Sequence, residues 1–413
     1  MMPRLGPGLG LDAATARRRS VFFRDAAHRL DGVAPALAAD FARGRYALAG
    51  ALVPLSSIIT ISSGAKRVSD AAGALVTVPA NMPAFARRSG RPRLLIEGPT
   101  TNLALDSAAI HGWLATGAHS PTRTGNVALA PDGTMAAARL DYPAGSGTAF
   151  GSVYRLITSP AASPAYAFSV WLRGALGGET IYLTWTKSSS VHQTIACTLT
   201  SQWQRFVLVS TLDTSGANYI NIGRDGRAGN ADTPAQTIYA WGAQIEAGDI
   251  ATSYVPTTAA AASRIADVVQ LTTGAAATLQ GAAASLAWRG RGRSAVASQP
   301  LVGLPSGYAL LRGGTAPAEL RLDGSSAAAL SLGSVLPGEI GAAVGWDGAG
   351  RAGAVNGAAA SADAAGLDRA RTGIFLGGAA GMPAGCALEI DELVAWATRG
   401  SGAALTGQAR GWA

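Results

Sequence analysis

The sequence contains little charge, little lysine and little cysteine. Charged residues make up 14% of the 413 positions, and Lys66 and Lys187 are its two lysines. A helical enzyme of this length usually carries more Glu and Lys, so we expect few helices. Cys197 and Cys386 lie far apart and neither belongs to a CxxC pair. This spacing argues against a disulfide framework and against a zinc site.

Motifs for catalysis and for phosphate binding are also missing. The sequence has no HExxH, GxSxG or GxxxxGK[ST] pattern, and the glycines of residues 145–151 follow no phosphate-loop spacing. Four histidines are dispersed without the spacing of metal ligands: His28, His111, His119 and His192. We therefore expect no cofactor, no bound metal ion and no catalytic residues.

No segment is expected to enter a membrane. The first ten residues lack the apolar core of a signal peptide. Residues 46–65 are uncharged over a transmembrane length, but Pro54 and several Ser and Thr residues lower the hydropathy, and the run Ser-Ile-Ile-Thr-Ile alternates as a strand does. We expect strand pairs of a soluble protein here.

The net charge of +8 is concentrated near the N-terminus. Residues 1–100 carry 14 Arg and Lys against 6 Asp and Glu, whereas the rest of the chain carries 19 of each. A basic arm can bind nucleic acid, a membrane or an acidic protein surface. Because no aromatic side chains are interleaved with these arginines, we do not expect nucleic-acid binding.

Two short helices are expected within residues 1–44. Asp12 can cap a helix that Asp31-Gly32 ends, and a second helix is expected over Pro35–Ala42. Such helices cannot form a core alone. They either attach the chain to a partner or form a frayed terminus.

Glycine and alternating apolar residues dominate the remainder, which favours an all-β fold. Between residues 98 and 262, alternating runs recur at the spacing of a β-sandwich, at 137–142, 148–157, 165–173, 180–187, 194–200, 203–212, 219–223 and 237–246. In the last run, Tyr239, Trp241, Ala243 and Ile245 alternate with small or polar residues. This alternation predicts one buried stripe.

Two phrases in the sequence carry a family resemblance. Residues 239–248 read Tyr-Ala-Trp-Gly-Ala-Gln-Ile-Glu-Ala-Gly, and residues 251–258 read Ala-Thr-Ser-Tyr-Val-Pro-Thr-Thr. They resemble the closing segment of a jelly-roll module found in fibre and spike proteins of tailed phages and phage-derived particles such as gene transfer agents. Residues 94–103, Leu-Leu-Ile-Glu-Gly-Pro-Thr-Thr-Asn-Leu, resemble the phrase that ends the β-rich connector before that module.

The last third of the chain resembles a second type of sandwich. Short strands divided by glycine are expected at 308–312, 318–322, 328–332, 340–346, 351–355 and 373–376. Gly345–Gly357 resembles a hairpin of concanavalin-like and laminin-G-like lectin domains. Ala387–Trp396, followed by a helix over 403–409, resembles the last strand and helix of that fold.

The same strand offers an enzyme alternative. Glu389 and Asp391 project from one side of it, roughly 7 Å apart by strand rise, a separation that suits paired carboxylates in glycoside hydrolysis. Retaining glucanases of this fold use an E-x-D-x-x-E pattern, but the third position here is Val394. Because the acid/base partner is missing, we expect no hydrolase.

A sugar-binding face is predicted on the jelly roll. In Ala165–Arg173, one face carries the core residues Tyr166, Phe168, Val170 and Leu172, and the other carries Trp171 and Arg173. Trp203 and Arg205 follow on a neighbouring run. Aromatic rings stack on sugar rings and arginine donates to hydroxyls and carboxylates. The alternative is that both tryptophans pack against a loop or a neighbouring subunit. Trp346 and Arg351 are the candidates in the second sandwich.

We therefore expect an all-β chain: a helical attachment segment (1–44), a β-rich connector (45–97), a jelly-roll carbohydrate-binding-like domain (98–262) and a concanavalin-like lectin domain (263–413). The resemblance implies a virion fibre or spike component, made in the bacterial cytoplasm. It would attach through its N-terminus to other virion proteins at a capsid vertex, portal or tail, and bind host-cell surface polysaccharide. It would be a homo-oligomer, a trimer or a pentamer. A spacer without a ligand and a polysaccharide depolymerase are the alternatives.

Overall fold

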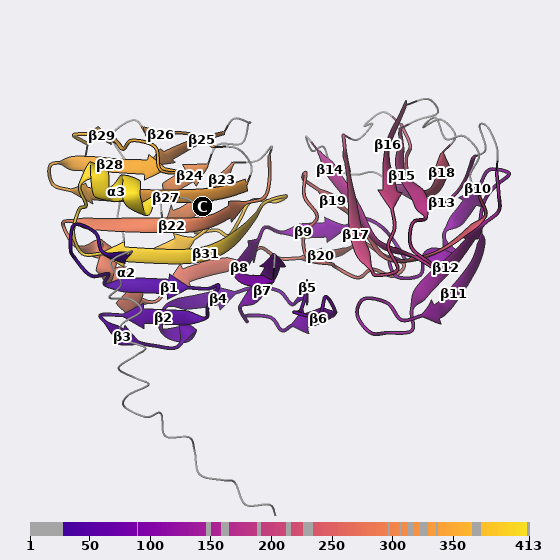
Figure 1. Ribbon diagram of the computed structural model, residues 1–413, viewed down its shortest axis with the longest axis horizontal. Coiled ribbons are helices and arrows are strands. Elements are labelled where there is room, and N and C mark those ends of the chain that lie inside the picture. Colours follow the sequence, from indigo (N-terminus) through magenta and orange to yellow (C-terminus); the bar gives the residue numbers. More distant parts are fainter. Residues whose placement is uncertain are drawn as a thin grey trace, which may run out of the picture.

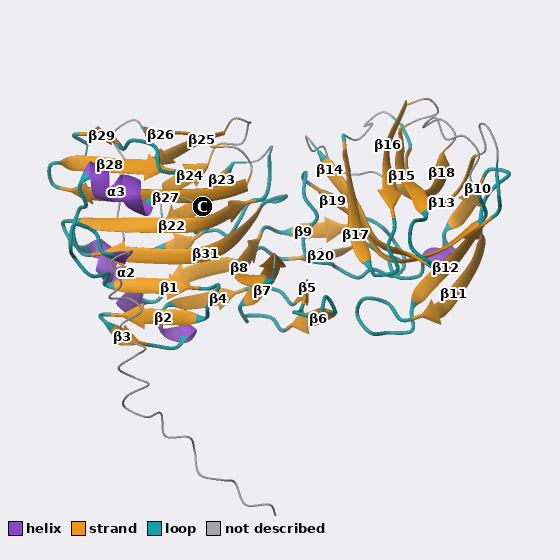
Figure 2. Cartoon of the chain, viewed as in Figure 1, coloured by secondary structure: helices purple, strands orange, loops and turns teal. Residues whose placement is uncertain are grey.

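The chain forms two β-sandwiches that lie side by side (Figure 1). The structure is a computed structural model, and it describes residues 28–88, 90–145, 150–157, 165–187, 191–211, 216–225, 234–295, 298–305, 307–312, 318–322, 329–335, 338–365 and 373–410. Strands make up nearly all of its regular structure, as Figure 2 shows. The expected all-β fold is confirmed.

The jelly roll consists of two antiparallel five-stranded sheets. The β15 sheet has the order β10 (Leu114–Thr116), β13 (Phe150–Ile157), β18 (Asn218–Asp225), β15 (Thr180–Lys187), β16 (Val191–Thr198). The β14 sheet has the order β11 (Thr122–Ala128), β12 (Ala137–Tyr142), β19 (Gln236–Ala247), β14 (Tyr166–Gly174), β17 (Gln204–Ser210). Alternate side chains meet between the sheets, so Tyr166, Phe168, Val170 and Leu172 are buried there as predicted.

The predicted stripe on β19 is only half correct. Ala243 and Ile245 point into the core, but Tyr239 and Trp241 lie on the outer face of the β14 sheet. Gly242, between the two halves, has a φ of +68°, and the pairing of β19 with β14 shifts register beside it. A bulge inserts one residue and so exchanges the inward and outward positions. Glycine suits this position because a side chain rarely adopts that φ.

The second sandwich is built from both ends of the chain. Its larger sheet has the order β29 (Ser361–Asp363), β28 (Gly350–Val355), β27 (Gly338–Asp347), β22 (Ala284–Gly292), β31 (Ala387–Trp396), β1 (Leu37–Asp40), β2 (Arg45–Leu48), β3 (Ala51–Leu52), with β8 (Arg91–Glu97) also on β31 and β7 (Ala84–Arg88) on β8. The facing sheet has the order β26 (Leu330–Val335), β25 (Ala318–Leu322), β24 (Gly307–Arg312), β23 (Gln299–Leu304), β30 (Phe375–Leu376), β21 (Val268–Leu271), β4 (Ile59–Ser62).

The helix predicted over Pro35–Ala42 is wrong. Residues 37–40 form β1, which pairs with β31 in the register Leu37↔Ala395. All four residues of β1 are buried, with Leu37 and Ala39 in the core between the sheets and Ala38 on the opposite face. Pairing with a distant strand thus overrides the helix propensity of alanine. The helix expected from Asp12 onward lies largely outside the described residues.

Residues 45–97 do not form a separate connector. Strands β2, β3, β4, β7 and β8 all belong to the sheets of the second sandwich. The jelly roll is therefore an insertion in that sandwich, entered through β9 (Thr100–Asn102) and left through β20 (Ala262–Arg264), which pair with each other. The hairpin of β5 (Lys66–Ser69) and β6 (Leu75–Val78) is a sheet of its own.

The end of the chain agrees with the prediction. Strand β31 spans Ala387–Trp396 and helix α3 spans Gly402–Gln408, and the side chain of Ser401 caps α3 by accepting a hydrogen bond from Ala404 N. Within the described residues, a further α-helix, α2, spans Thr273–Gln280, and single turns of 3-10 helix lie at Leu55–Ser57 and Ile110–Gly112. Within the described ranges, no helix combines the length and the apolar character that crossing a membrane requires.

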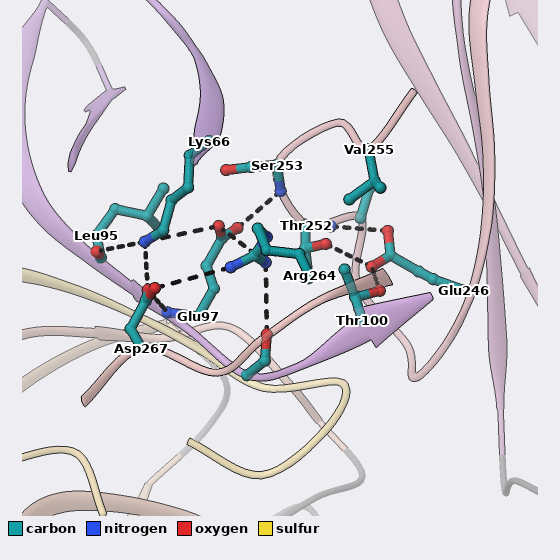
Figure 3. A network of polar contacts seen from close by, with 12 residues as sticks. Lys66, Leu95, Glu97, Thr100, Glu246, Thr252, Ser253, Val255, Arg264 and Asp267 are labelled. Atoms are coloured by element: carbon teal, nitrogen blue, oxygen red, sulfur yellow. Dashed lines mark hydrogen bonds and ion pairs between the residues drawn. The ribbon is translucent and has the colours of Figure 1, made fainter. Parts of the chain in front are cut away.

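A buried network of charges joins the two sandwiches (Figure 3). Arg264 lies 3.2 Å from a carboxylate oxygen of Glu97, and the ammonium of Lys66 pairs with Asp267. Burial acts to raise the pKa of Glu97, but Arg264 and Lys66 hold it below its ordinary value. The other oxygen of Glu97 accepts from Ser253 N at 2.8 Å. The network therefore ties the exit of the jelly roll to strands of the second sandwich.

Candidate functional site

The four jelly-roll candidates gather on the outer face of the β14 sheet. Trp171 of β14 is directly opposite Arg205 of β17, and Arg173 is directly opposite Tyr239 of β19. Trp203 immediately precedes β17. The sequence therefore identified one face correctly, but the two halves of this face have different surroundings.

Trp171 lies in the covered half. It is 7% exposed, and its ring centroid lies 5.6 Å from that of Trp241 and 5.5 Å from that of Tyr254. Leu75 of the β5–β6 hairpin belongs to the same buried cluster. At this tryptophan the alternative of packing against a loop is the one that the structure shows.

Arg205 completes the covered half. Its guanidinium lies 4.3 Å from the ring centroid of Trp171, and it donates to Thr252 O at 2.6 Å and to Ser169 Oγ at 2.9 Å. Burial lowers the pKa of Arg205 to about 10, so the side chain is still charged at neutral pH. Arg205 thus holds the segment after β19 against the sheet.

The open half carries a row of four side chains across the sheet. The guanidinium of Arg173 lies between the rings of Tyr239 and Trp203, 4.2 and 5.3 Å from their centroids. All three are half-buried, and Arg139 of β12, opposite Tyr239, is exposed. Trp203 Nε1 donates to Leu129 O at 3.1 Å. We call Arg139, Tyr239, Arg173 and Trp203 the open row.

A pocket lies at the end of the same sheet. It has a volume of about 890 Å³, and its lining includes Asp141, Leu176, Glu179, Gln236 and Thr237. Asp141 Oδ1 accepts from Thr237 Oγ1 at 2.6 Å and from Arg139 Nε at 2.9 Å. Arg139 therefore connects the open row with the pocket.

The pocket contains ionised groups beside an apolar surface. Burial acts to raise the pKa of Glu179, but hydrogen bonds from the backbone N–H groups of Leu176 and Gly177 hold it below its ordinary value. Leu176 itself is 90% exposed. Directional acceptors next to exposed apolar and aromatic surface suit a polyhydroxylated ligand, because sugar rings present both hydroxyls and an apolar face.

Sequence reasoning missed three members of this site. Tyr239 was assigned to the core because the bulge at Gly242 cannot be seen in the alternation. Arg139 and Asp141 could have been predicted from the sequence, because both take outward positions on the strand predicted over 137–142.

Trp346 and Arg351 cannot line a surface site. They are paired across β27 and β28, and they are 3% and 0% exposed. The Arg351 guanidinium donates to both carboxylate oxygens of Asp363, at 2.9 to 3.2 Å, and lowers the pKa of that carboxyl. This carboxylate follows Arg351 by twelve positions and reaches it through the pairing of β28 with β29. Arg351 is therefore a buried structural residue whose charge is neutralised by a partly exposed carboxylate.

The two carboxylates of the enzyme alternative are also buried. Glu389 and Asp391 are 6% and 1% exposed. Arg93 Nε lies 3.0 Å from Asp391, and Arg293 Nε lies 3.5 Å from Glu389. Burial raises the pKa of Asp391 to about 6. Among the described residues, no group of three His, Cys, Asp or Glu side chains is arranged to hold a metal ion.

Comparisons with known proteins give little further information. No protein-family model matches the sequence, and no curated protein matches it. A structure of the CBM22-1-GH10 modules of endo-1,4-beta-D-xylanase 10B from Clostridium thermocellum, complexed with xylohexaose, is 11% identical with a TM-score of 0.26, and the match covers 39% of this chain and 30% of that chain. The CBM22-1-CBM22-2 tandem domain of Xyn10C from Paenibacillus barcinonensis is 9% identical with a TM-score of 0.24. That match covers 69% of this chain and 91% of that chain. Similarity this weak supports no statement about a ligand.

Proposed function

We propose that this protein is a non-enzymatic, carbohydrate-binding component of a fibre or spike on a tailed-phage or gene-transfer-agent particle. The observation that carries the proposal is the open row beside the pocket. Two aromatic rings with an arginine between them lie on a sheet, next to a carboxylate that already accepts two hydrogen bonds. A rigid strand scaffold holds such groups in place before a ligand arrives.

The chemistry of the open row favours a sugar. The half-exposed rings of Tyr239 and Trp203 offer apolar surface, and Arg173 and Arg139 offer N–H donors. Asp141 and Gln236 add an acceptor and an amide at the pocket. Saccharide binding of this kind is weak for each site, so several copies on one particle would be needed for adhesion.

The particle role rests on the sequence resemblance of residues 94–103 and 239–258 to fibre and spike proteins. In this proposal the N-terminal part of the chain binds other virion proteins, at a capsid vertex, portal or tail, and the jelly roll binds host surface polysaccharide. The protein works as a homo-oligomer, a trimer or a pentamer, because closed symmetry multiplies weak sugar sites.

A role without catalysis is favoured by the surroundings of the carboxylates on β31. Arg93 lies within 3.0 Å of Asp391 and 4.0 Å of Glu389, and both carboxylates are covered. A glycoside hydrolase needs its acid and its nucleophile in contact with the substrate. We therefore expect no release of reducing ends from host polysaccharide.

A glycan-binding assay on the full chain tests the proposal. The double variant Arg173→Ala/Trp203→Ala should lose at least about tenfold in affinity for whichever oligosaccharide the wild type binds, since it removes a stacking ring and a charged donor. Arg399→Ala is the matched control, because Arg399 is a half-buried arginine on the second sandwich, paired with Asp347 at 2.8 Å. Equal affinity of the double variant and the wild type would refute the site. A wild type that binds no glycan would favour the spacer alternative.

A further inference from the structure

A cleft separate from the pocket described above lies between the two sandwiches. It has a volume of about 320 Å³, at the lower end of the range for small-ligand pockets. Strands β5 and β7 supply Arg67 and Arg87, the jelly roll supplies Trp171 and Arg205, and Arg293 follows β22. Four arginines from four separate segments thus line one cleft, and two of them come from the basic N-terminal hundred residues.

Two of these arginines have carboxylate partners. Arg67 lies 3.0 Å from Asp132, and Arg293 lies 3.5 Å from Glu389. Glu97 also lines the cleft, but it is fully buried and Arg264 lies 3.2 Å from it. The charges of these three residues are therefore compensated within the protein.

The other two arginines have no carboxylate at ion-pair distance among the residues that the structure describes. The side chain of Arg87 is exposed and forms no hydrogen bond or ion pair with any residue that the structure describes. Arg205 donates hydrogen bonds to a carbonyl and a hydroxyl, and its Nε is buried without an acceptor. The carboxylates of Glu246 and Glu97 lie farther away and offset part of its charge. Arg87 therefore adds an unpaired positive charge to the cleft, beside the guanidinium of Arg205.

The walls of the cleft are held in place. The network of Figure 3 joins Glu97 to Ser253, and both residues line the cleft. On the hairpin side, Leu75 packs into the cluster of Trp171, Trp241 and Tyr254. A ligand would therefore meet a preformed site and would not have to order it, which reduces the cost of binding.

We propose that this cleft binds the carboxylate of an acidic sugar unit, such as a uronic acid residue. The guanidinium fork matches the geometry of a carboxylate, and bonds between charged groups are about twice as strong as neutral ones. The edge of Trp171 and the exposed Ser69 complete a wall suited to a sugar ring and its hydroxyls. The inference rests on the proposed function, because it specifies an acidic polysaccharide as the ligand.

Calorimetry on the full chain tests the role of the carboxylate. Trigalacturonic acid and its methyl ester are the probes, since esterification removes the negative charges and adds only one methyl group to each carboxyl. The wild type should bind the acid at least about tenfold more tightly, and Arg87→Gln should lose most of that preference. Arg45→Gln, at an exposed arginine of β2 outside the cleft, is the control and should keep it. A wild type without the preference, or an Arg87→Gln variant that keeps it, overturns the proposal.

Indole N–H signals in NMR spectra separate this site from the open row. D-galacturonate should shift the signal of Trp171, which lines the cleft, and D-galactose should leave it unchanged. The signal of Trp203 reports on the open row, so its failure to respond to either sugar counts against the proposed function and not against the cleft. A Trp171 signal that D-galacturonate leaves in place refutes the cleft site. An equal shift with inorganic phosphate in place of D-galacturonate would also refute it, because the cleft would then be a general anion site.

Discussion

Two halves of one sheet face contain the same residue types in different surroundings. Trp171 of β14 is directly opposite Arg205 of β17, and the guanidinium of Arg173 on β14 lies 5.3 Å from the ring centroid of Trp203, which immediately precedes β17. Trp171 is buried beneath the β5–β6 hairpin and Tyr254, and Arg205 donates a hydrogen bond to Thr252 of the segment after β19, whereas Trp203 and Arg173 are half-buried. A tryptophan and an arginine on an outer face therefore do not define a binding site. What lies over them decides whether a ligand can reach them from the outer face of the sheet.

The largest expected effect separates the two tryptophans by stability. Trp171→Ala should lower the free energy of unfolding by about 3–5 kcal/mol, since it removes a buried ring from the junction of the sandwiches. Trp203→Ala should cost about 1 kcal/mol or less, because that ring is half-exposed. Denaturant unfolding of the full chain measures both. Equal losses would break the distinction between the covered and the open half.

The next largest expected effect is the pH dependence of stability that the buried carboxylate of Asp391 causes. The pKa of Asp391 is about 6 in the folded chain, above the ordinary value of 3.8. The unfolded chain therefore ionises at lower pH, and stability is lost as the pH rises from about 4 to about 6. A difference of about two units between the folded and unfolded pKa corresponds to a loss of about 3 kcal/mol in the free energy of unfolding. This loss is complete above about pH 6.

Asp391→Asn should remove this dependence, because an amide does not ionise. Unfolding free energies from pH 4 to 7 should then be flatter than those of the wild type. Parallel curves for wild type and Asp391→Asn would show that the ionisation of Asp391 is not disfavoured in the fold.

A conservative change at the open row should affect binding without affecting the fold. Arg173→Lys keeps the charge but loses the planar guanidinium between Tyr239 and Trp203. We expect about a tenfold weaker glycan affinity and an unchanged melting temperature. Unchanged affinity would mean that a point charge is sufficient there and that stacking contributes nothing.

The smallest expected effect is at the pocket. Asp141→Asn weakens the acceptor of the bonds from Arg139 and Thr237, so glycan affinity should fall about threefold to tenfold. Calorimetry with the oligosaccharide of the wild type measures it. A loss as large as that of the double variant at Arg173 and Trp203 would move the centre of the site from the row into the pocket.

Most of the strands could be predicted because alternation is a local signal. Strands β12, β15, β25 and β31 lie where the sequence predicts them. The partners of strands are not local, and for this reason the pairing of β1 with β31 and the insertion of the jelly roll were missed. The alanine-rich β1 even favours a helix until its pairing is known.

The site could be predicted only in part, for the same reason. Arg173 and Trp203 follow from strand parity, but the cover over Trp171 comes from Leu75, almost a hundred positions earlier. Tyr239 depends on a bulge, and the burial of Arg351 depends on a carboxylate from another strand. Each of these outcomes is set by a contact that the local sequence pattern does not contain.

A crystal structure of the full chain with its bound oligosaccharide tests the central claim most directly. The account predicts a sugar ring in van der Waals contact with Trp203 or Tyr239, hydrogen-bonded to Arg173 or Arg139, with Trp171 and Arg205 unmoved beneath their cover. A sugar bound elsewhere, with the open row left empty, would contradict it. So would a sugar in contact with Trp171 after displacement of the β5–β6 hairpin, because the covered half would then be the binding site.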